Sequence, residues 1–291
     1  MRSSWAVILG VAALVVACTK VPFTGRNQFN LIPDSIMNGI GASSYKSMLA
    51  DSKTVKKGDD HQTLVKVGGK ISKVAKKPEY DWEYNLLDSD EINAWCLPGG
   101  KIGIYTGILP VLQNEAGMAF VMGHEVGHAT AHHGSERLSQ SLALIGGLAG
   151  LEIYMANATQ VKPKDRAIIL GALGIGGTVG VLLPFSRMHE SEADVVGMMY
   201  MASAGYPPAE SLDIWTRMEA ATGPSVIPAF LSTHPSNAKR TENLREWLPT
   251  AKKRFERNKL AYDTTSMLWK GLPATGKDTG KEGKAAKKGK G

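Results

Sequence analysis

The segment His124-Glu125-Val126-Gly127-His128 constrains this chain more than any other feature of its sequence. In an α-helix, residues four positions apart lie on the same face, so both imidazoles can reach one metal ion. Glu125 lies beside that face and can act as a general base on a water molecule. The same five residues also fit an amphipathic helix that merely exposes two histidines to solvent. The surrounding sequence must decide between these interpretations.

The flanking sequence predicts one long helix from Asn114 to Ser139, because apolar or small residues recur there at helical spacing. Asn114 followed by Glu115 is typical of an N-cap with an acidic first turn. Both motif histidines then lie in mid-helix, where their geometry is rigid. His132 and His133 follow shortly after. We expect them to be surface residues or to support the ligands rather than to bind metal themselves.

Composition and charge narrow the class of protein. The 291 residues are 43% hydrophobic, enough to bury one sizeable core. The formal net charge is +7, but six lysines fall within the last fifteen residues, and no aromatic and basic platform for nucleic acid is visible. We therefore expect no nucleic-acid partner. Residues 263–291 are predicted to form a disordered Gly/Lys-rich tail that aids solubility, with weak attraction to anionic lipid or cell-wall polymer as the alternative.

The N-terminus has the layout of a secretory signal peptide over residues 1–17. Arg2 precedes an apolar stretch, Trp5 to Ala17, that is too short to span a membrane as a mature helix. The sequence Val15-Val16-Ala17-Cys18 resembles a bacterial lipobox, in which Cys18 is lipidated and becomes the first mature residue. Thr19, rather than an aspartate, predicts sorting to the outer membrane, facing the periplasm. With Cys18 lipidated, residues 18–32 would form a lipidated anchor segment. The alternative is an ordinary signal peptide with a chance cysteine.

The rest of the chain is predicted to form one α+β domain, residues 33–262, that is mainly helical with a small antiparallel sheet. Hydrophobic patterning predicts helices at Asp34 to Leu49, His61 to Ala75, Tyr206 to Ala220 and Asn237 to Lys259, and strands at Trp82 to Leu87, Ile92 to Cys96 and Lys101 to Tyr105. Cys96 is predicted to be a small buried hydrophobe.

The strand containing Lys101, Ile102, Gly103 and Ile104 is predicted to lie at the edge of that sheet. An extended peptide substrate could add to such an edge as another strand. A plain core hairpin, turned at Pro98-Gly99-Gly100, is the alternative.

Residues Ser141 to Phe185 are rich in glycine and aliphatic side chains, and Ala167 to Phe185 carries no charge over nineteen residues. That length is sufficient for a membrane span. However, five glycines and a proline weaken the segment as a helix, and one span would place His124 and Glu190 on opposite sides of a bilayer. We therefore expect a helical hairpin that packs on the protein or dips partly into a membrane surface.

A catalytic zinc ion takes three protein ligands and keeps one open position, so a third ligand must lie outside the motif. Glu190 and Asp194 are four residues apart and share a helix face. One carboxylate can bind the metal while the other holds a ligand histidine by its free N–H. Glu192 points about half a turn away, and we expect it to face solvent or to pair with Arg187. An ordinary charged helix is the alternative.

Several segments, in a fixed order, make the chain resemble the M48 family of zinc metallopeptidases. The matching segments are Asn93-Ala94, Pro98-Gly99-Gly100-Lys101-Ile102, Tyr105-Thr106-Gly107, the motif at 124–128, Ser186 to Gly197, and Thr233-His234-Pro235 with Arg240. Together they extend over Val21 to Arg245. No C-terminal tetratricopeptide-like repeat of the kind some periplasmic relatives carry is present in the sequence.

The resemblance implies a zincin-like fold with an edge strand above the active site. It also implies the following roles: His124, His128 and Glu190 bind one zinc ion, Glu125 is the general base and acid, and Asp194 supports a ligand.

His234 and Arg240 have two possible roles each. His234 could stabilise a tetrahedral oxyanion, or it could occupy the open position of the zinc and hold the enzyme inactive. Arg240 could add positive charge near the reacting carbonyl or bind substrate carbonyls.

These features predict a zinc-dependent endopeptidase anchored by lipid to the periplasmic face of a bacterial outer membrane. Its expected substrates are misfolded or damaged envelope proteins. Two alternatives remain at this point. One is a non-catalytic, chaperone-like lipoprotein with a structural zinc ion, and the other is a zinc amidase that acts on the cell wall.

Overall fold

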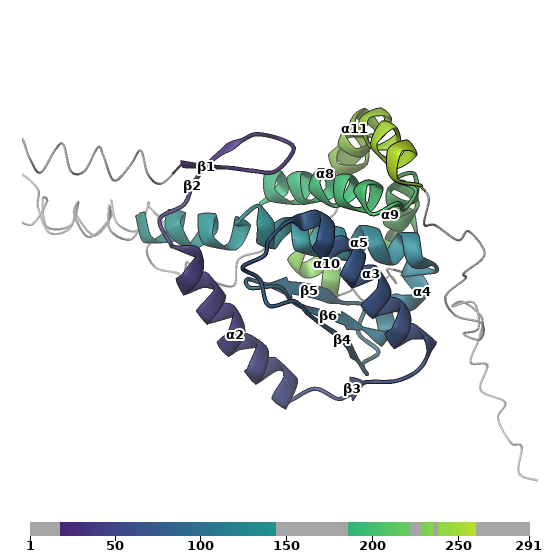
Figure 1. The fold of residues 1–291 in the computed structure, drawn as a ribbon, viewed down its shortest axis with the longest axis horizontal. Helices are drawn as coiled ribbons and strands as arrows, with labels where there is room; N and C mark the ends of the chain where they lie inside the picture. Colours follow the sequence, from purple (N-terminus) through teal and green to yellow (C-terminus); the bar gives the residue numbers. More distant parts are fainter. Residues whose placement is uncertain (1–17, 144–185, 222–228, 236–237, 260–291) are drawn as a thin grey trace, which may run out of the picture.

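The computed structural model describes residues 18–143, 186–221, 229–235 and 238–259, which Figure 1 shows in colour. The strands are β1 (Cys18–Lys20), β2 (Asn27–Phe29), β3 (Thr54–Val55), β4 (Glu83–Leu87), β5 (Ala94–Leu97) and β6 (Lys101–Tyr105). The helices are α2 (Asp34–Ala50), α3 (Asp59–Ala75), the 3₁₀ turn η1 (Thr106–Ile108), α4 (Leu109–Leu112), α5 (Glu115–Thr130), α8 (Arg187–Ser203), α9 (Glu210–Ala220), α10 (Ala229–Thr233) and α11 (Ala238–Asn258). A further helical stretch covers residues 133–143. The predicted mainly helical α+β class is confirmed.

The sheet has the strand order β3-β4-β6-β5 and is mixed. β5 and β6 are antiparallel, as expected, and their connection contains Gly99 and Gly100 with φ of 87° and 85°, values that favour glycine. β4 and β6 are parallel, so the prediction of a purely antiparallel sheet was wrong for this pair. The reason is that the chain places β5 outside β6 rather than between β6 and β4.

This strand order also overturns the predicted edge strand. Lys101, Ile102 and Ile104 belong to β6, which pairs with β4 on one side and β5 on the other. Lys101 is buried and its ammonium group contacts the carboxylates of Asp81 and Glu83, at 2.6 Å each. Within the described residues, the strand with an unpaired side next to the motif helix is β5.

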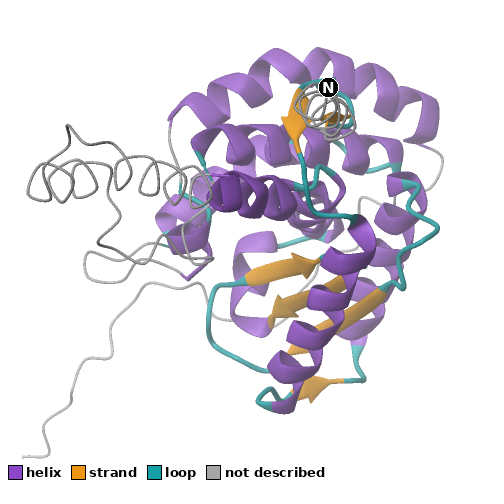
Figure 2. Cartoon of the chain, turned by 90° about the vertical axis from the view of Figure 1, so that its left-hand side faces the viewer, coloured by secondary structure: helices purple, strands orange, loops and turns teal. Residues whose placement is uncertain are grey.

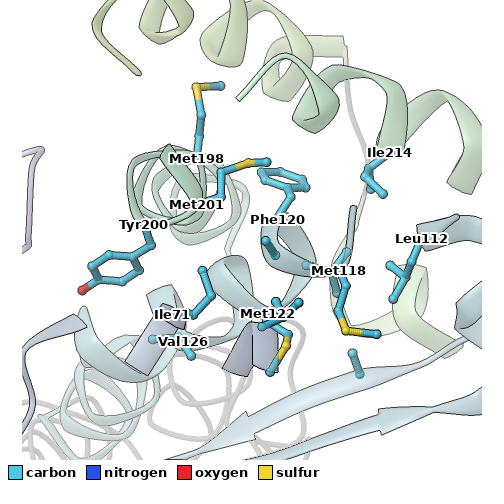
Figure 3. Close-up of a cluster of buried hydrophobic side chains, with 14 of the residues drawn as sticks. Ile71, Leu112, Met118, Phe120, Met122, Val126, Met198, Tyr200, Met201 and Ile214 are labelled. Atoms are coloured by element: carbon cyan, nitrogen blue, oxygen red, sulfur yellow. The ribbon is translucent and has the colours of Figure 1, made fainter. Parts of the chain in front are cut away.

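Helix α5, which carries the motif, lies at the centre of the molecule. The sheet lies on one side of α5 and α8 on the other, with α11 packed beyond α8 (Figures 1 and 2). Every residue of α5 is buried, as expected for a helix covered on all faces. The expected N-cap is confirmed, because the Asn114 side chain accepts a hydrogen bond from the Gly117 N–H at 2.8 Å. Figure 3 shows the core between these layers, which includes Met118, Phe120 and Met122 of α5, Met198 and Met201 of α8, and Ile214 of α9.

Two glycines allow α5 and α8 to approach closely. A Cβ atom on Gly197 would lie 2.6 Å from the backbone nitrogen of His124, and a Cβ on Gly123 would lie 2.8 Å from the carbonyl oxygen of Gly197. No side chain fits at such distances, because the atoms it would meet belong to the backbone. The crossing therefore brings the polar face of α8 directly beside the motif histidines.

The predicted long helix from Asn114 is interrupted after the motif. α5 ends at Thr130, and His132 has a φ of 54°, in the left-handed region that non-glycine residues rarely adopt. A second helical stretch starts at residue 133. The interruption redirects the chain, so His132 contacts Asp34 on α2 at 3.0 Å while His133 turns toward the interior.

The segment before α2 packs on the domain instead of standing apart from it. β1 and β2 form a short antiparallel hairpin around a turn that contains Pro22 and Gly25. Gln28 is buried and donates to the carbonyl of Ala131 at 2.7 Å, and Phe23 contacts Tyr200 edge to face. The hairpin therefore contacts the domain that was expected to begin at residue 33.

Some predicted features lie outside the described residues. They are the signal peptide at 1–17, nearly all of the hairpin at 141–185 and the tail at 263–291. Among the helices that are described, none combines the length and the apolar composition needed to cross a bilayer.

Candidate metal centre

Four side chains from three separate regions of the sequence meet at one buried point. His124 and His128 come from α5, Glu190 from the first turn of α8, and His234 directly follows α10. One ligand atom from each of the four lies within 4.8 Å of every other. Each of the four residues is at most 4% exposed, so the centre is closed to solvent.

The spacing of these atoms fits a zinc ion. Ligand atoms of tetrahedral zinc lie about 3.3 Å apart, because the Zn–N distance is about 2.0–2.1 Å. Here the Nε2 atoms of His124 and His128 are 3.1 Å apart, and Oε1 of Glu190 is 3.3 Å from His128 Nε2. Nδ1 of His234 is 3.3 Å from His124 Nε2 and 3.2 Å from Glu190 Oε1. Nitrogen and carboxylate oxygen are also the donors that zinc prefers.

The electrostatics of the centre favour a cation. Burial lowers the pKa of His124, but Asp194 and Glu190 outweigh burial and raise the pKa of this imidazole to about 9. Burial raises the pKa of Glu190, and the surrounding histidines more than offset it and hold that pKa well below its usual range. The pKa of His128 is well below its usual range because the ring is buried, so this imidazole stays neutral, as a metal ligand must.

Asp194 and Arg240 support the His124 side of the centre. Oδ1 of Asp194 lies 3.0 Å from Nδ1 of His124, the ring nitrogen opposite the metal-facing one. Arg240, on α11, contacts both carboxylate oxygens of Asp194, at 2.7 and 2.8 Å, and its Nη1 lies 2.9 Å from Glu190 Oε2. Its guanidinium also stacks on the Trp215 ring, 3.8 Å from the ring centre. Arg240 is 1% exposed, so the structure places it behind the ligands and not in the expected position against substrate carbonyls.

His133 occupies the corresponding position behind His128. The Nδ1 atoms of the two rings are 3.0 Å apart, and Nε2 of His133 lies 3.1 Å from Oε2 of Glu192. Glu192 also accepts hydrogen bonds from Arg26 and Thr24 of the N-terminal hairpin, at 2.8 and 2.6 Å. The prediction that Glu192 faces solvent or pairs with Arg187 was therefore wrong. It is buried because the hairpin covers this face of α8.

Glu125 points to the opposite side of the ligand cluster, between His234 and the edge strand β5. Its Oε1 lies 3.4 Å from Nε2 of His234, and the backbone N–H of Cys96 in β5 donates a hydrogen bond to its carboxylate. Burial raises the pKa of Glu125 above its usual range. A carboxylate with a raised pKa is a better proton acceptor near neutral pH than an ordinary glutamate. Cys96 is only half-buried by surface area, but burial raises the pKa of its thiol, consistent with the unreactive role expected for it.

One supporting residue was not found from the sequence. Arg26 gave no signal, because it lies in a turn far from both motifs, and only the fold brings it to Glu192. His133 was expected to lie at the surface or to support the ligands, and its contact with His128 fits the second of these expectations. Gly134, directly after His133, is the local sequence signal that could have indicated the break in the helix.

A buried cluster of two histidines four residues apart and a glutamate from a second helix, with another glutamate beside it, is typical of a zinc metallopeptidase. The sequence profile of peptidase family M48 matches residues 59–248. The chain is 31% identical over 252 residues to the mitochondrial metalloendopeptidase OMA1 of Schizosaccharomyces pombe, covering 85% of this chain and 72% of that protein. It is 32% identical over 258 residues to the OMA1 of Saccharomyces cerevisiae, with 82% and 71% covered.

A bacterial relative is more distant. The β-barrel assembly-enhancing protease of Escherichia coli is 27% identical over 180 residues, which is 60% of this chain and 36% of that protein. The chain belongs to peptidase family M48 and is a zinc metalloendopeptidase. The expected family, enzyme class and cofactor are thereby confirmed, and the non-catalytic and cell-wall amidase alternatives are set aside.

Proposed function

We propose that this protein is a lipid-anchored zinc endopeptidase of a bacterial outer membrane that cleaves misfolded or damaged envelope proteins in the periplasm. The observation that carries the catalytic part is the buried cluster in which His124, His128 and Glu190 converge with Glu125 beside them. In this proposal those three side chains hold the zinc ion, and Asp194 and Arg240 orient His124 and Glu190 without touching substrate.

The chemistry follows from the positions of the residues. When bound, zinc lowers the pKa of a water molecule and polarises the scissile carbonyl. Glu125 accepts the proton of the attacking water and later delivers it to the leaving amine. Its neighbours support this role, because the carboxylate lies next to the ligand cluster and its pKa is raised by burial.

β5 takes the substrate-binding role in place of β6. The β5–β6 register pairs Trp95 with Gly103 and Cys96 with Ile102, and the bond from the Tyr105 N–H to the Asn93 carbonyl places Asn93 and Trp95 on the paired side. The backbone groups of Ala94 and Cys96 therefore point outward, toward Glu125. An extended peptide added here would lie beside the metal ligands.

This role can be tested with peptides alone. N-methylation of a substrate amide removes one strand hydrogen bond, so methylation of alternate residues should block cleavage in one register and leave it intact in the other. Equal sensitivity at every position would contradict addition to β5.

In this proposal, His234 would act as a fourth ligand of a bound zinc ion when no substrate is present. Its Nδ1 lies as close to His124 Nε2 and Glu190 Oε1 as zinc ligands lie to one another. Substrate must displace it, so His234→Ala should increase the rate of cleavage of a short peptide. A decrease would instead assign His234 to oxyanion stabilisation, and an unchanged rate would remove it from the mechanism.

The catalytic assignment is tested by Glu125→Gln, which keeps size and removes the base. Casein cleavage by the full-length protein should fall by about 10²–10⁴-fold while bound zinc, measured by metal analysis, stays at the wild-type level. Glu242→Gln, on α11 and outside the centre, provides a matched control. Wild-type cleavage by the Glu125 variant would exclude the proposed base.

Casein cleavage by the wild-type enzyme should also stop when a chelator is added.

The location rests on the sequence around Cys18, and the name of the Escherichia coli relative connects a family member with β-barrel assembly. In a bacterial host, Cys18→Ser should shift the protein from the outer-membrane fraction to the soluble periplasm. An unchanged membrane fraction would contradict lipidation.

Substrates should be enriched when the Glu125→Gln protein is used as a trap in living cells.

A further inference from the structure

A continuous row of polar side chains connects the N-terminal hairpin to the metal centre. It runs from Arg26 to Glu192, with Nε and Nη2 at 2.9 and 2.8 Å from Oε2, and from Glu192 to His133 at 3.1 Å. It ends at the 3.0 Å contact between His133 and His128. His128, His133 and Glu192 are all buried, so these contacts act in a medium of low dielectric, where they are stronger than in water.

The hydrogen-bond directions along this row are consistent with only one arrangement if His128 binds zinc through Nε2. Nδ1 of His128 then carries the proton and donates to Nδ1 of His133. His133 in turn has its proton on Nε2 and donates it to Glu192, a carboxylate that can only accept. Arg26 donates to the same carboxylate. Each group therefore fixes the proton and the ring orientation of the next, ending at the ligand.

A second branch from the same arginine provides an internal comparison. Arg26 also contacts Glu136 through two bonds, at 2.8 and 2.7 Å, and Glu136 lies 3.0 Å from His189. The two branches share the arginine, a buried carboxylate and a histidine. They differ in their ends, because the row through Glu192 reaches His128, whereas the row through Glu136 reaches His189, which is not a proposed zinc ligand.

We propose that Arg26, Glu192 and His133 are positioning residues for the zinc ligand His128, so that the N-terminal hairpin is a working part of the metal centre. The inference rests on the proposed function, specifically on His128 as a ligand. Outer groups that orient a ligand histidine typically contribute about 10–100-fold to metal affinity. The row through His133 does for His128 what Asp194 does for His124.

The test compares two carboxylates in the full-length protein. Glu192→Gln and Glu136→Gln each neutralise one partner of Arg26, and the zinc Kd is measured by competition with a chromophoric chelator. Glu192→Gln should raise the zinc Kd about 10–100-fold. Glu136→Gln should leave it near the wild-type value, even where urea unfolding of the zinc-free protein shows that both variants lose similar stability. The inference would be overturned if Glu192→Gln had the wild-type zinc Kd, or if both variants weakened zinc binding equally.

A second variant keeps the test decisive if Glu192→Gln does not fold. His133→Phe retains an aromatic ring where His133 now stacks on His189, at 4.5 Å between ring centres, but removes the acceptor for His128. It should weaken zinc binding as Glu192→Gln does.

A third variant, His128→Asn, distinguishes failure of the proposed function from failure of the inference about the positioning residues. If it binds zinc normally, the proposed function fails. If it loses zinc while Glu192→Gln and His133→Phe bind it normally, the inference alone fails.

Discussion

The two flanks of the metal centre reach the same result by different routes. The Asp194 flank uses one carboxylate directly against His124, locked by Arg240 at 1% exposure and covered by Trp215. The Arg26 flank inserts His133 between carboxylate and ligand, and its arginine side chain is 23% exposed. The first flank is part of the folded core, whereas the second is attached from outside by a short hairpin. Mutations in the first flank should therefore lower the free energy of unfolding more than mutations in the second.

The largest effect is expected from Arg240→Met. It leaves the carboxylates of Asp194 and Glu190 buried without their arginine, and breaking a buried ion pair from one side costs about 3–5 kcal/mol. The free energy of unfolding from urea titration of the zinc-free protein should fall by that amount. A loss below about 1 kcal/mol, the range of exposed ion pairs, would show that the flank is not a buried core element.

A smaller loss of stability is expected from Arg26→Met, although the side chain contacts two carboxylates. Hydrogen bonds to charged groups contribute about 1.5–3 kcal/mol, and solvent can partly replace the guanidinium at this more exposed site. The same urea titration measures the change, with Arg187→Met, at an exposed position on α8, as control. If Arg26→Met destabilises the protein as much as Arg240→Met, the contrast between the flanks is not valid.

The smallest effect is expected from Thr24→Val, which keeps the shape of the side chain and removes its hydroxyl. The hydrogen bond from Thr24 to Glu192 is a single contact at the rim of the hairpin. The free energy of unfolding should therefore fall by about 1 kcal/mol. The shift in melting temperature should be correspondingly small, and the zinc Kd should change less than in Glu192→Gln. A larger change in Kd than in Glu192→Gln would mean that the hydroxyl, and not the arginine, holds the carboxylate.

The sequence predicted the features that depend on short spacing. His124 with His128, and Glu190 with Asp194, are each four residues apart, and a helix converts that spacing into one face without any knowledge of the fold. The helices and the β6 strand were placed to within two or three residues at most ends for the same reason, since hydrophobic periodicity is local. The order of the motifs along the chain was sufficient to indicate the family.

The features that the sequence did not predict depend on tertiary packing. Arg26 and Glu192 are 166 residues apart, and nothing in the local pattern of either residue indicates the other. The assumption that neighbouring strands pair in order failed at β4, which pairs in parallel with β6. The left-handed residue His132 interrupted the predicted long helix and changed the direction of the helical stretch that follows it.

The position of the hairpin has a practical consequence for anyone who trims this enzyme. The family match begins at residue 59, so a recombinant fragment cut to that boundary would contain every proposed zinc ligand and still lack Arg26 and Thr24. Such a fragment would release its metal more readily during purification. Its low activity would then result from the missing hairpin and not from a property of the intact enzyme. Lipid attachment at Cys18 would fix a point only eight residues from Arg26, so membrane tethering and metal retention would share one short stretch of chain.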